Sequence, residues 1–148
     1  MTKIGMTGSR RGMTKVQKDW FAEFAKTYHP IEFHHGDCVG ADEDGHNIVN
    51  IFNYAKIVVH PPIDPKLRAF CMIDPTRGDE IREEKDYLDR NKDIVNETEL
   101  LIAFPNNDVT HRGPGGGGTW ATVRYARSVG KKVIVVYKNG NLDILEDL

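Results

Sequence analysis

The sequence from Glu99 to Thr122, ELLIAFPNNDVTHRGPGGGGTWAT, joins an apolar run, a glycine-rich turn and the beginning of a helical pattern. The apolar run ends at Phe104 and is followed by Pro105-Asn106-Asn107, which is typical of a strand buried on both faces. Beyond the glycines, apolar residues recur at helical spacing until Gly130. A buried strand, a glycine turn and a helix in this order form the repeating unit of a parallel α/β sheet.

The glycine turn from Gly115 to Thr119 predicts a phosphate-binding site. Glycine has no Cβ, so consecutive glycines let the backbone approach an anion, and the following helix contributes free N–H groups and the positive end of its dipole. A disordered glycine linker is the alternative, but such linkers are also serine-rich, whereas this run leads into Trp120 and Val123. A phosphorylated small molecule is therefore the expected ligand.

The rest of the chain alternates strand, loop and helix. We expect strands over 3–7, 31–35, 55–59, 99–104 and 131–137, helices over 16–28, 41–52 and 119–129, and one or two helices between 79 and 98. The segment 61–78 is expected to be irregular, and the last eleven residues to form at most a small edge element. This order predicts an α/β fold: a Rossmann-like parallel sheet of about five strands with helices on both faces, in a single domain over 1–148.

The composition limits the possible functions. The chain of 148 residues is 39% hydrophobic, which suffices for the core of one domain. Its 20 Lys and Arg against 22 Asp and Glu give a net charge of −2, which argues against nucleic-acid binding by bulk electrostatics. Cys38 and Cys71 form no CxxC motif, and no apolar run is long enough for a signal peptide or a membrane span. We therefore expect a cytoplasmic protein that does not enter the membrane.

Unusual loops follow the predicted strands. They are Gly8-Ser9-Arg10, the segment from His35 to Asp42, His60-Pro61-Pro62 and the glycine turn. Ligands of open α/β sheets bind beyond the carboxyl ends of the strands, where the strand order reverses. If the first and fourth strands are neighbours, these loops line one cleft. Ser9 and Arg10 offer donors suited to phosphate, and Asp42 either caps the next helix or accepts from ribose hydroxyls.

Several of these segments, in this order, resemble the SLOG superfamily of Rossmann-like proteins related to Smf/DprA and to the LOG ("lysine decarboxylase-like") proteins. The matching segments span about residues 4–137 and are Gly8-Ser9-Arg10, His35-Gly36-Asp37-Cys38-Val39-Gly40-Ala41-Asp42, His60-Pro61-Pro62 with Lys66-Leu67-Arg68-Ala69-Phe70, Tyr87-Leu88-Asp89-Arg90-Asn91 and Gly118-Thr119-Trp120-Ala121-Thr122. The resemblance implies that the chain binds a nucleotide or a nucleotide-derived ligand.

LOG enzymes cleave the N-glycosidic bond of nucleoside monophosphates with a Pro-Gly-Gly-x-Gly-Thr-x-x-Glu motif and an arginine. In this chain Pro114 to Thr119 match the motif, but Thr122 stands at the glutamate position. A threonine hydroxyl takes no proton from water at neutral pH without a base, so hydrolysis requires that another carboxylate enter the cleft. The nearest substitutes in the sequence are Glu83, Glu84 and Asp86. The resemblance thus favours binding over catalysis.

The same residues permit other interpretations: a dinucleotide site, a metal site or a nucleophilic cysteine. Gly113, Gly115 and Gly118 formally satisfy GxGxxG, but a dinucleotide fingerprint belongs after the first strand, and the chain has no GxxxxGK[ST] motif. Acidic and histidine residues from His34 to His46 match neither HExxH nor an EF-hand loop, so no metal is expected. A nucleophilic Cys38 paired with a nearby histidine is an open alternative without further support. Trp120 stacks on a base or packs against the sheet.

The sequence thus predicts a sensor or sequestering protein for a nucleotide or a phosphorylated nucleoside derivative; the alternative is a LOG-like N-glycoside hydrolase or base transferase acting on nucleoside monophosphates. The predicted ligand-binding residues are Gly8, Ser9, Arg10, His35, Gly36, Asp37, Gly40, Asp42, Arg90, Asn91, Gly115, Gly116, Gly117, Gly118, Thr119, Trp120 and Thr122, and the candidate catalytic residues are Arg90 and Glu84. No cofactor is expected, and the chain is expected to form a homo-oligomer. DNA binding in the manner of Smf/DprA would require Arg10, Arg11, Arg124, Arg127, Lys131 and Lys132 to share one face.

Overall fold

The computed structural model describes residues 2–52, 55–107 and 117–146. Its elements, in chain order, are β1 (Lys3–Gly8), α1 (Lys15–Tyr28), β2 (Glu32–His35), α2 (Ala41–Phe52), β3 (Lys56–Val59), the short 3₁₀ helices η1 (Pro65–Leu67) and η2 (Pro75–Arg77), β4 (Glu80–Ile81), α3 (Tyr87–Asn96), β5 (Leu100–Phe104), α4 (Gly117–Ser128), β6 (Lys132–Val136) and β7 (Leu142–Leu145).

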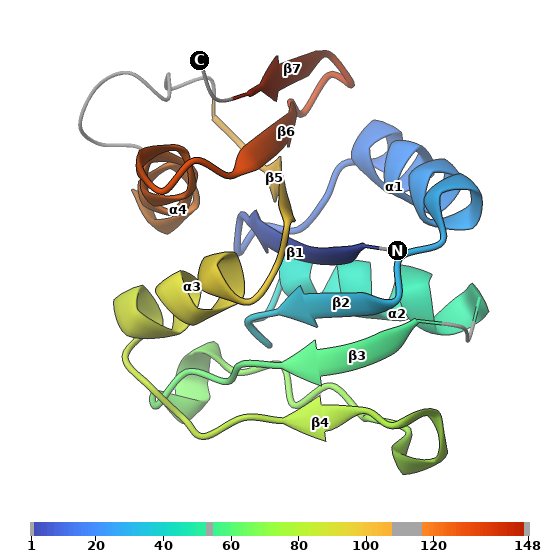
Figure 1. Ribbon diagram of the computed structural model, residues 1–148, viewed down its shortest axis with the longest axis vertical. Coiled ribbons are helices and arrows are strands. Elements are labelled where there is room, and N and C mark those ends of the chain that lie inside the picture. Colours follow the sequence, from blue (N-terminus) through green and yellow to red (C-terminus); the bar gives the residue numbers. More distant parts are fainter. Residues whose placement is uncertain (1, 53–54, 108–116, 147–148) are drawn as a thin grey trace.

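The strands form one sheet in the order β4-β3-β2-β1-β5-β6-β7. All neighbouring strands are parallel except β6 and β7, which are antiparallel. Helices α1 and α2 pack together on one face, and α3 and α4 on the other (Figure 1). The predicted Rossmann-like α/β architecture is therefore confirmed.

The central strand β1 lies between β2 and β5, and its register with β5 runs from Ile4 opposite Leu100 to Gly8 opposite Phe104. The chain builds one half of the sheet outward from β1 through β2, β3 and β4, and the other half through β5, β6 and β7. The strand order thus reverses between β1 and β5. The first and fourth of the expected strands are therefore neighbours, which was the condition for their loops to line one cleft.

Two layers of apolar side chains cover the sheet. On the α1 and α2 face, Ile4, Phe21, Phe33 and Phe104 are fully buried, and the Phe21 ring lies edge-on to the Phe104 ring at 5.4 Å between centroids. On the α3 and α4 face, the core is built around Leu101, Val123, Val133 and Trp120. All five residues of β5 are buried, as the apolar run at 99–104 predicts.

Two edge strands raise the count from the predicted five to seven. Residues 79–86, expected to be helical, do not belong to α3, which begins only at Tyr87. The reason is a tertiary one: the buried Asp79 carboxylate accepts from the Ile57 N–H at 2.9 Å and the Asp74 N–H at 2.8 Å. These bonds hold the following residues extended beside β3, where Glu80 and Ile81 form β4. The predicted edge element near the carboxyl end is β7.

Gln17 connects the start of α1 to two strand ends. Thr14 and Gln17 form a reciprocal capping box, in which the Gln17 side-chain oxygen accepts from the Thr14 N–H at 2.8 Å. The Gln17 side-chain amide donates to the carbonyls of Val136 at 2.8 Å and Pro105 at 3.1 Å. This side chain is buried, so all three partners lose water on folding.

We predict that Gln17→Ala lowers the free energy of unfolding by about 2–4 kcal/mol, because it leaves two buried carbonyls and one N–H without partners. Urea unfolding followed by circular dichroism measures the change. Thr27→Ala, on the exposed side of the same helix, is the control and should shift stability by less than about 0.5 kcal/mol. Equal stability of Gln17→Ala and the wild type would contradict the prediction.

Candidate functional site

A cleft of about 600 Å³ opens at the carboxyl ends of β1 and β5, where the strand order reverses. Loops after β1, β2 and β5 and the first turns of α3 and α4 enclose it. The residues that line it are Met6, Thr7, Gly8, Ser9, Arg10, Arg11, Cys38, Asp42, Tyr87, Arg90, Asn91, Asn106, Asn107, Gly117, Gly118 and Thr119. This is the position at which open α/β sheets bind their ligands.

The loop after β1 is fastened to both sides of the cleft. The Ser9 N–H donates to the Phe104 carbonyl at 3.1 Å, and the Ser9 carbonyl accepts from the Ala41 N–H at 2.9 Å. Gly40, with φ of +99°, passes so close to this loop that a Cβ would lie 2.4 Å from the Arg10 carbonyl oxygen. The side chain at position 40 is therefore excluded by backbone packing, and the walls that carry Ser9 and Asp42 are held together.

Helix α4 begins at the mouth of the cleft with Gly117, Gly118 and Thr119. Among the described residues, a Cβ at Gly118 would meet only the Tyr87 ring, at 3.5 Å, and one at Gly117 would meet nothing within 4 Å. Space for a ligand thus lies directly at the first turn of α4, where the N–H groups have no helical acceptor. Gly115 and Gly116, also predicted to bind phosphate, lie outside the described residues.

Arg10 and Arg11 supply positive charge to the cleft. Both are exposed, and no salt bridge links either of them to another described residue. Elsewhere many basic side chains of the protein are paired, for example Arg82 with Glu97 at 2.7 Å and Lys85 with Asp93 at 2.7 Å. The cleft is therefore a locally cationic region on a chain whose net charge is −2.

Arg90 forms part of the cleft floor and is only 5% exposed. Its guanidinium group donates to the carbonyls of Gly36 and His60, the latter at 3.2 Å, and lies 3.5 Å from the Cys38 sulfur. No side chain fits at Gly36, since a Cβ there would overlap the guanidinium group. Arg90 therefore joins α3 to the ends of β2 and β3 as well as contributing charge.

Asp42, in the first turn of α2, is 7% exposed and also lines the cleft. Its Oδ2 accepts from the Cys38 N–H at 3.2 Å. Burial raises the pKa of this carboxyl group to about 6, while the nearby Arg90 guanidinium and the N–H groups of Cys38 and Gly36 act in the opposite direction. The group is thus a weak acid that gains and loses a proton close to neutral pH.

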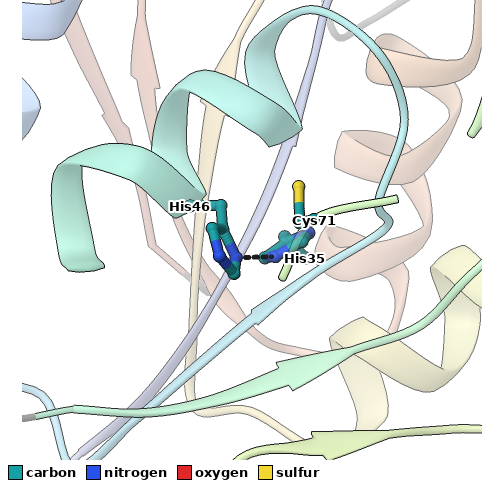
Figure 2. Close-up of side chains that lie close together, drawn as sticks. All are labelled: His35, His46 and Cys71. Carbon is teal, nitrogen blue, oxygen red and sulfur yellow. Dashed lines mark hydrogen bonds between the residues drawn. The ribbon is translucent and has the colours of Figure 1, made fainter. Parts of the chain in front are cut away.

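His35 and Asp37, predicted to contact the ligand, lie beneath the cleft and hold its loop. Asp37 has φ of +55°, and its carboxylate accepts from Arg68 Nε at 2.8 Å and from the Cys71 N–H at 2.9 Å. The His35 ring is fully buried, and its Nε2 lies 2.9 Å from Nδ1 of His46 (Figure 2). Neither residue lines the cleft, so direct ligand contact by them stays a prediction without geometric support.

His35, His46 and Cys71 bring three metal-ligand atoms within 4.8 Å of one another. However, both ring nitrogens of His35 and of His46 already take part in hydrogen bonds. His35 Nδ1 accepts from the Asp37 N–H, so its proton resides on Nε2 and is donated to His46 Nδ1; His46 Nε2 then donates to the Met72 carbonyl at 2.8 Å. A metal ion would have to replace the proton between the rings. The arrangement is a chain of neutral histidines.

A second chain of histidines lies on β2 and after β3. His34 Nε2 donates to the Glu32 carboxylate at 2.8 Å, so His34 Nδ1 accepts from His60 Nε2, also at 2.8 Å. Burial lowers the pKa of His34, and it lowers that of His60 to about 3 with help from the neighbouring His34. Burial likewise lowers the pKa of His35 and His46. All four rings are therefore neutral near pH 7.

Of the remaining predicted residues, one lines the cleft and three do not. Asn91 lines the cleft, one helical position after Arg90. Trp120 is fully buried and donates to the Asn107 side chain at 2.8 Å, and Thr122 donates to the Gly118 carbonyl at 2.8 Å, so both pack within the α4 layer. Glu84 is exposed, pairs with Arg68 at 3.2 Å and does not line the cleft.

Some cleft residues were absent from the sequence prediction: Met6, Thr7, Arg11, Cys38, Tyr87, Asn106 and Asn107. For three of these residues, Tyr87, Asn106 and Asn107, the sequence did contain an indication. Tyr87 lies three and four positions before Arg90 and Asn91, on the same helical face, and the two asparagines directly follow β5. Met6 and Thr7 carry no such signal, because which residues of a buried strand border a cleft depends on the loops above it.

The comparisons with known proteins support the fold alone. The X-ray structure of TM1055, a structural genomics target, matches with a TM-score of 0.59 over 90% of this chain and 72% of that one, at 15% sequence identity. No protein-family model and no curated protein matches the chain. Within the described ranges, no helix is long and apolar enough to cross a membrane.

We predict that the free energy of unfolding falls as the pH drops from about 6.5 to 5, because burial lowers the pKa of the four histidines and the unfolded chain therefore takes up more protons there than the folded one. Each such proton contributes a slope of up to about 1.4 kcal/mol per pH unit. Asp42 has the opposite effect on this slope, because its raised pKa lets the folded state take up one proton in the same pH range.

Urea unfolding at several pH values between 5 and 7.5 measures this slope. His60→Gln retains a donor toward His34 but takes up no proton, so its slope should be smaller by about one proton. A stability that is flat or that rises toward pH 5 would contradict the assignment of neutral buried histidines.

Proposed function

We propose that the cleft binds a phosphorylated, nucleoside-derived small molecule and that the protein acts as a sensor or sequestering protein for it. The observation that carries the proposal is the convergence, at the ends of β1 and β5, of the first turn of α4, the Ser9 loop and two arginines that form no salt bridge with another described residue. Free helical N–H groups and guanidinium groups bind phosphate strongly. A cleft of about 600 Å³ is large enough for a ligand of nucleotide size.

The chemistry of the lining suggests how such a ligand would lie. Phosphate would meet the N–H groups of Gly118 and Thr119 together with Ser9 and Arg10. The sugar would then lie over the cleft floor, where Asp42 can accept from its hydroxyl groups. Tyr87, 41% exposed beside the start of α4, is available to stack on a base.

The resemblance to the SLOG superfamily supports a nucleotide in this cleft, because its segments supply Gly8, Ser9, Arg10, Asp42 and the start of α4 to the lining. The geometry speaks against DNA binding over one basic face. Arg10 and Arg11 lie at the carboxyl edge of the sheet, whereas Arg127 and Lys131 lie at the far end of α4 and beyond it, where they border a separate shallow pocket. A cytoplasmic location and assembly into a homo-oligomer remain part of the proposal.

We predict that AMP, ADP and ADP-ribose raise the melting temperature and that adenosine does not, because the anion site supplies most of the binding free energy. A ligand at one hundred times its Kd stabilises the folded state by about 2.7 kcal/mol. The Arg10→Ala/Arg11→Ala double variant should lose most of the shift, and Lys26→Ala, an exposed residue of α1, should keep it. If adenosine shifts the melting temperature as much as AMP does, the anion site is wrongly assigned.

We predict that Gly118→Val abolishes phosphate-dependent binding while the chain stays folded. Of the residues that the structure describes, the new side chain would touch only the Tyr87 ring, at ordinary contact distance, so we expect the fold to tolerate it. Its methyl groups would fill the space above the first turn of α4. Isothermal titration with AMP, together with circular dichroism, measures both properties. A folded Gly118→Val variant that binds AMP normally would remove the phosphate site from this position.

A further inference from the structure

A second cluster of possible metal ligands lies outside the cleft lining. His34, His60 and Glu97 each offer one ligand atom, and these three atoms lie within 4.8 Å of one another. His34 belongs to β2, His60 follows β3 and Glu97 follows α3, so segments far apart in the chain supply them. His34 and His60 are 1% and 2% exposed, whereas Glu97 is an exposed residue. Two buried imidazoles thus adjoin an exposed carboxylate, through which ions from the solvent can reach the cluster.

The hydrogen bonds of the two rings orient the nitrogens that a metal ion would need. His34 Nε2 donates to the Glu32 carboxylate at 2.8 Å, which leaves Nδ1 as the ligand nitrogen of His34. A histidine that binds a metal usually donates its other ring N–H to a carboxylate or a carbonyl in this way, because the bond fixes the tautomer and raises the basicity of the ligand nitrogen. Nδ1 of His34 lies 2.8 Å from Nε2 of His60. Glu32 therefore prepares His34 for a metal ion bound between the two rings.

A metal ion can replace the hydrogen bond between the rings while both rings stay neutral. In the metal-free protein, His60 Nε2 donates to His34 Nδ1. Among the described residues, nothing forms a hydrogen bond with Nδ1 of His60, so the ring proton can move to that nitrogen and leave Nε2 to the metal. Zn–N bonds of about 2.0–2.1 Å in a tetrahedron separate two nitrogens by about 3.3 Å. The rings therefore need to move apart by only about 0.5 Å from their 2.8 Å contact.

The cluster of His35, His46 and Cys71 lacks this possibility (Figure 2). His35 Nδ1 accepts from the Asp37 N–H, so a metal ion on Nε2 would leave the His35 ring without any proton. Burial and the nearby Asp37 carboxylate also raise the pKa of the Cys71 thiol, whereas the form of cysteine that binds a metal is the thiolate. The hydrogen bonds thus favour His34 and His60 over His35 and His46 as metal ligands.

Arg82 holds Glu97 in the metal-free protein by an ion pair that is easily exchanged. Arg82 Nη2 donates to the Glu97 carboxylate at 2.7 Å, and Nη1 donates to Glu80. The side chains of Arg82 and Glu97 are 39% and 37% exposed, and ion pairs between exposed side chains contribute little to stability. Arg82 can remain paired with Glu80 when the Glu97 carboxylate turns to a metal ion.

We propose that His34, His60 and Glu97 form a binding site for Zn²⁺, with Glu32 as the hydrogen-bond acceptor that orients His34. Two imidazoles and one carboxylate suit zinc, whereas Mg²⁺ and Ca²⁺ prefer oxygen ligands alone. Because Glu97 is exposed, water can occupy the fourth position of the tetrahedron. The bound ion links the end of α3 to β2 and to the segment after β3. The site is independent of the ligand that the cleft binds.

The test titrates Zn²⁺ into chelator-treated protein in competition with a chromogenic zinc indicator. We expect the wild type to bind Zn²⁺, and Glu97→Gln and His60→Gln to bind it at least about tenfold more weakly, since the loss of an outer hydrogen-bond partner alone costs about 10–100-fold. Glu97 is exposed, so its variant should keep the fold, which circular dichroism checks. Glu99→Gln, an exposed carboxylate two residues further along, is the matched control and should bind Zn²⁺ like the wild type.

Co²⁺ in place of Zn²⁺ reports the types of ligand. Tetrahedral Co²⁺ absorbs visible light, and a thiolate ligand adds an intense charge-transfer band in the near ultraviolet. We expect the visible bands without the thiolate band, unchanged in Cys71→Ser and lost in Glu97→Gln at the same Co²⁺ concentration.

A thiolate band that disappears in Cys71→Ser would overturn the proposal and place the metal ion at Cys71. Absence of Zn²⁺ binding by the wild type would also overturn it, as would equal Zn²⁺ affinity of the wild type and the folded Glu97→Gln variant.

Discussion

The central strand β1 is hydrogen-bonded on both sides, to β2 and to β5, and the cleft depends on this position. Parallel strands end at the same edge of a sheet, so the loops that follow β1, β2 and β5 meet there. Ser9 then fastens them to one another, through its N–H to the Phe104 carbonyl and its carbonyl to the Ala41 N–H. The loop after β1 is thereby held by main-chain bonds, which do not depend on the identity of a side chain.

Several polar groups are buried beneath the cleft, and hydrogen bonds join them to one another or to main-chain carbonyls. Arg90 donates to carbonyls at the ends of two strands, and the Asp37 carboxylate accepts a hydrogen bond from Arg68. Four histidines form two hydrogen-bonded chains of neutral rings. Buried polar groups stabilise a fold only when they are fully hydrogen-bonded, and then they specify one geometry. This network gives the loop after β2 a fixed shape even though it contains two glycines, and it makes that shape sensitive to acid.

Positive and negative side chains are unevenly distributed in the cleft. Arg10 and Arg11 lie at the exposed mouth, where they can attract an anionic ligand and exchange water for phosphate oxygens at low cost. Asp42 and Arg90 lie at the buried floor, where the same electrostatic forces act over a shorter distance in a less polar medium. Under the proposed function, a ligand whose phosphate lies at the mouth would have its sugar near Asp42, the one acidic residue of the described lining.

The sequence by itself determined the architecture of this protein, because the buried run at Leu100–Phe104 and the helical face of Ala41–Phe52 have the periodicity of their final structure. It also pointed to Ser9, Arg10, Asp42 and Gly118 as cleft residues, since loops after parallel strands meet at one edge, whereas Arg90 was indicated by the resemblance to the SLOG superfamily. Tertiary structure alone decided the rest. It placed Glu80 and Ile81 in a strand through the distant bonds of Asp79, it turned His35 and Thr122 away from the cleft, and it left Asp42 as the carboxylate of the described lining. Those outcomes depend on contacts between segments far apart in the chain, and no local pattern of residue types records them.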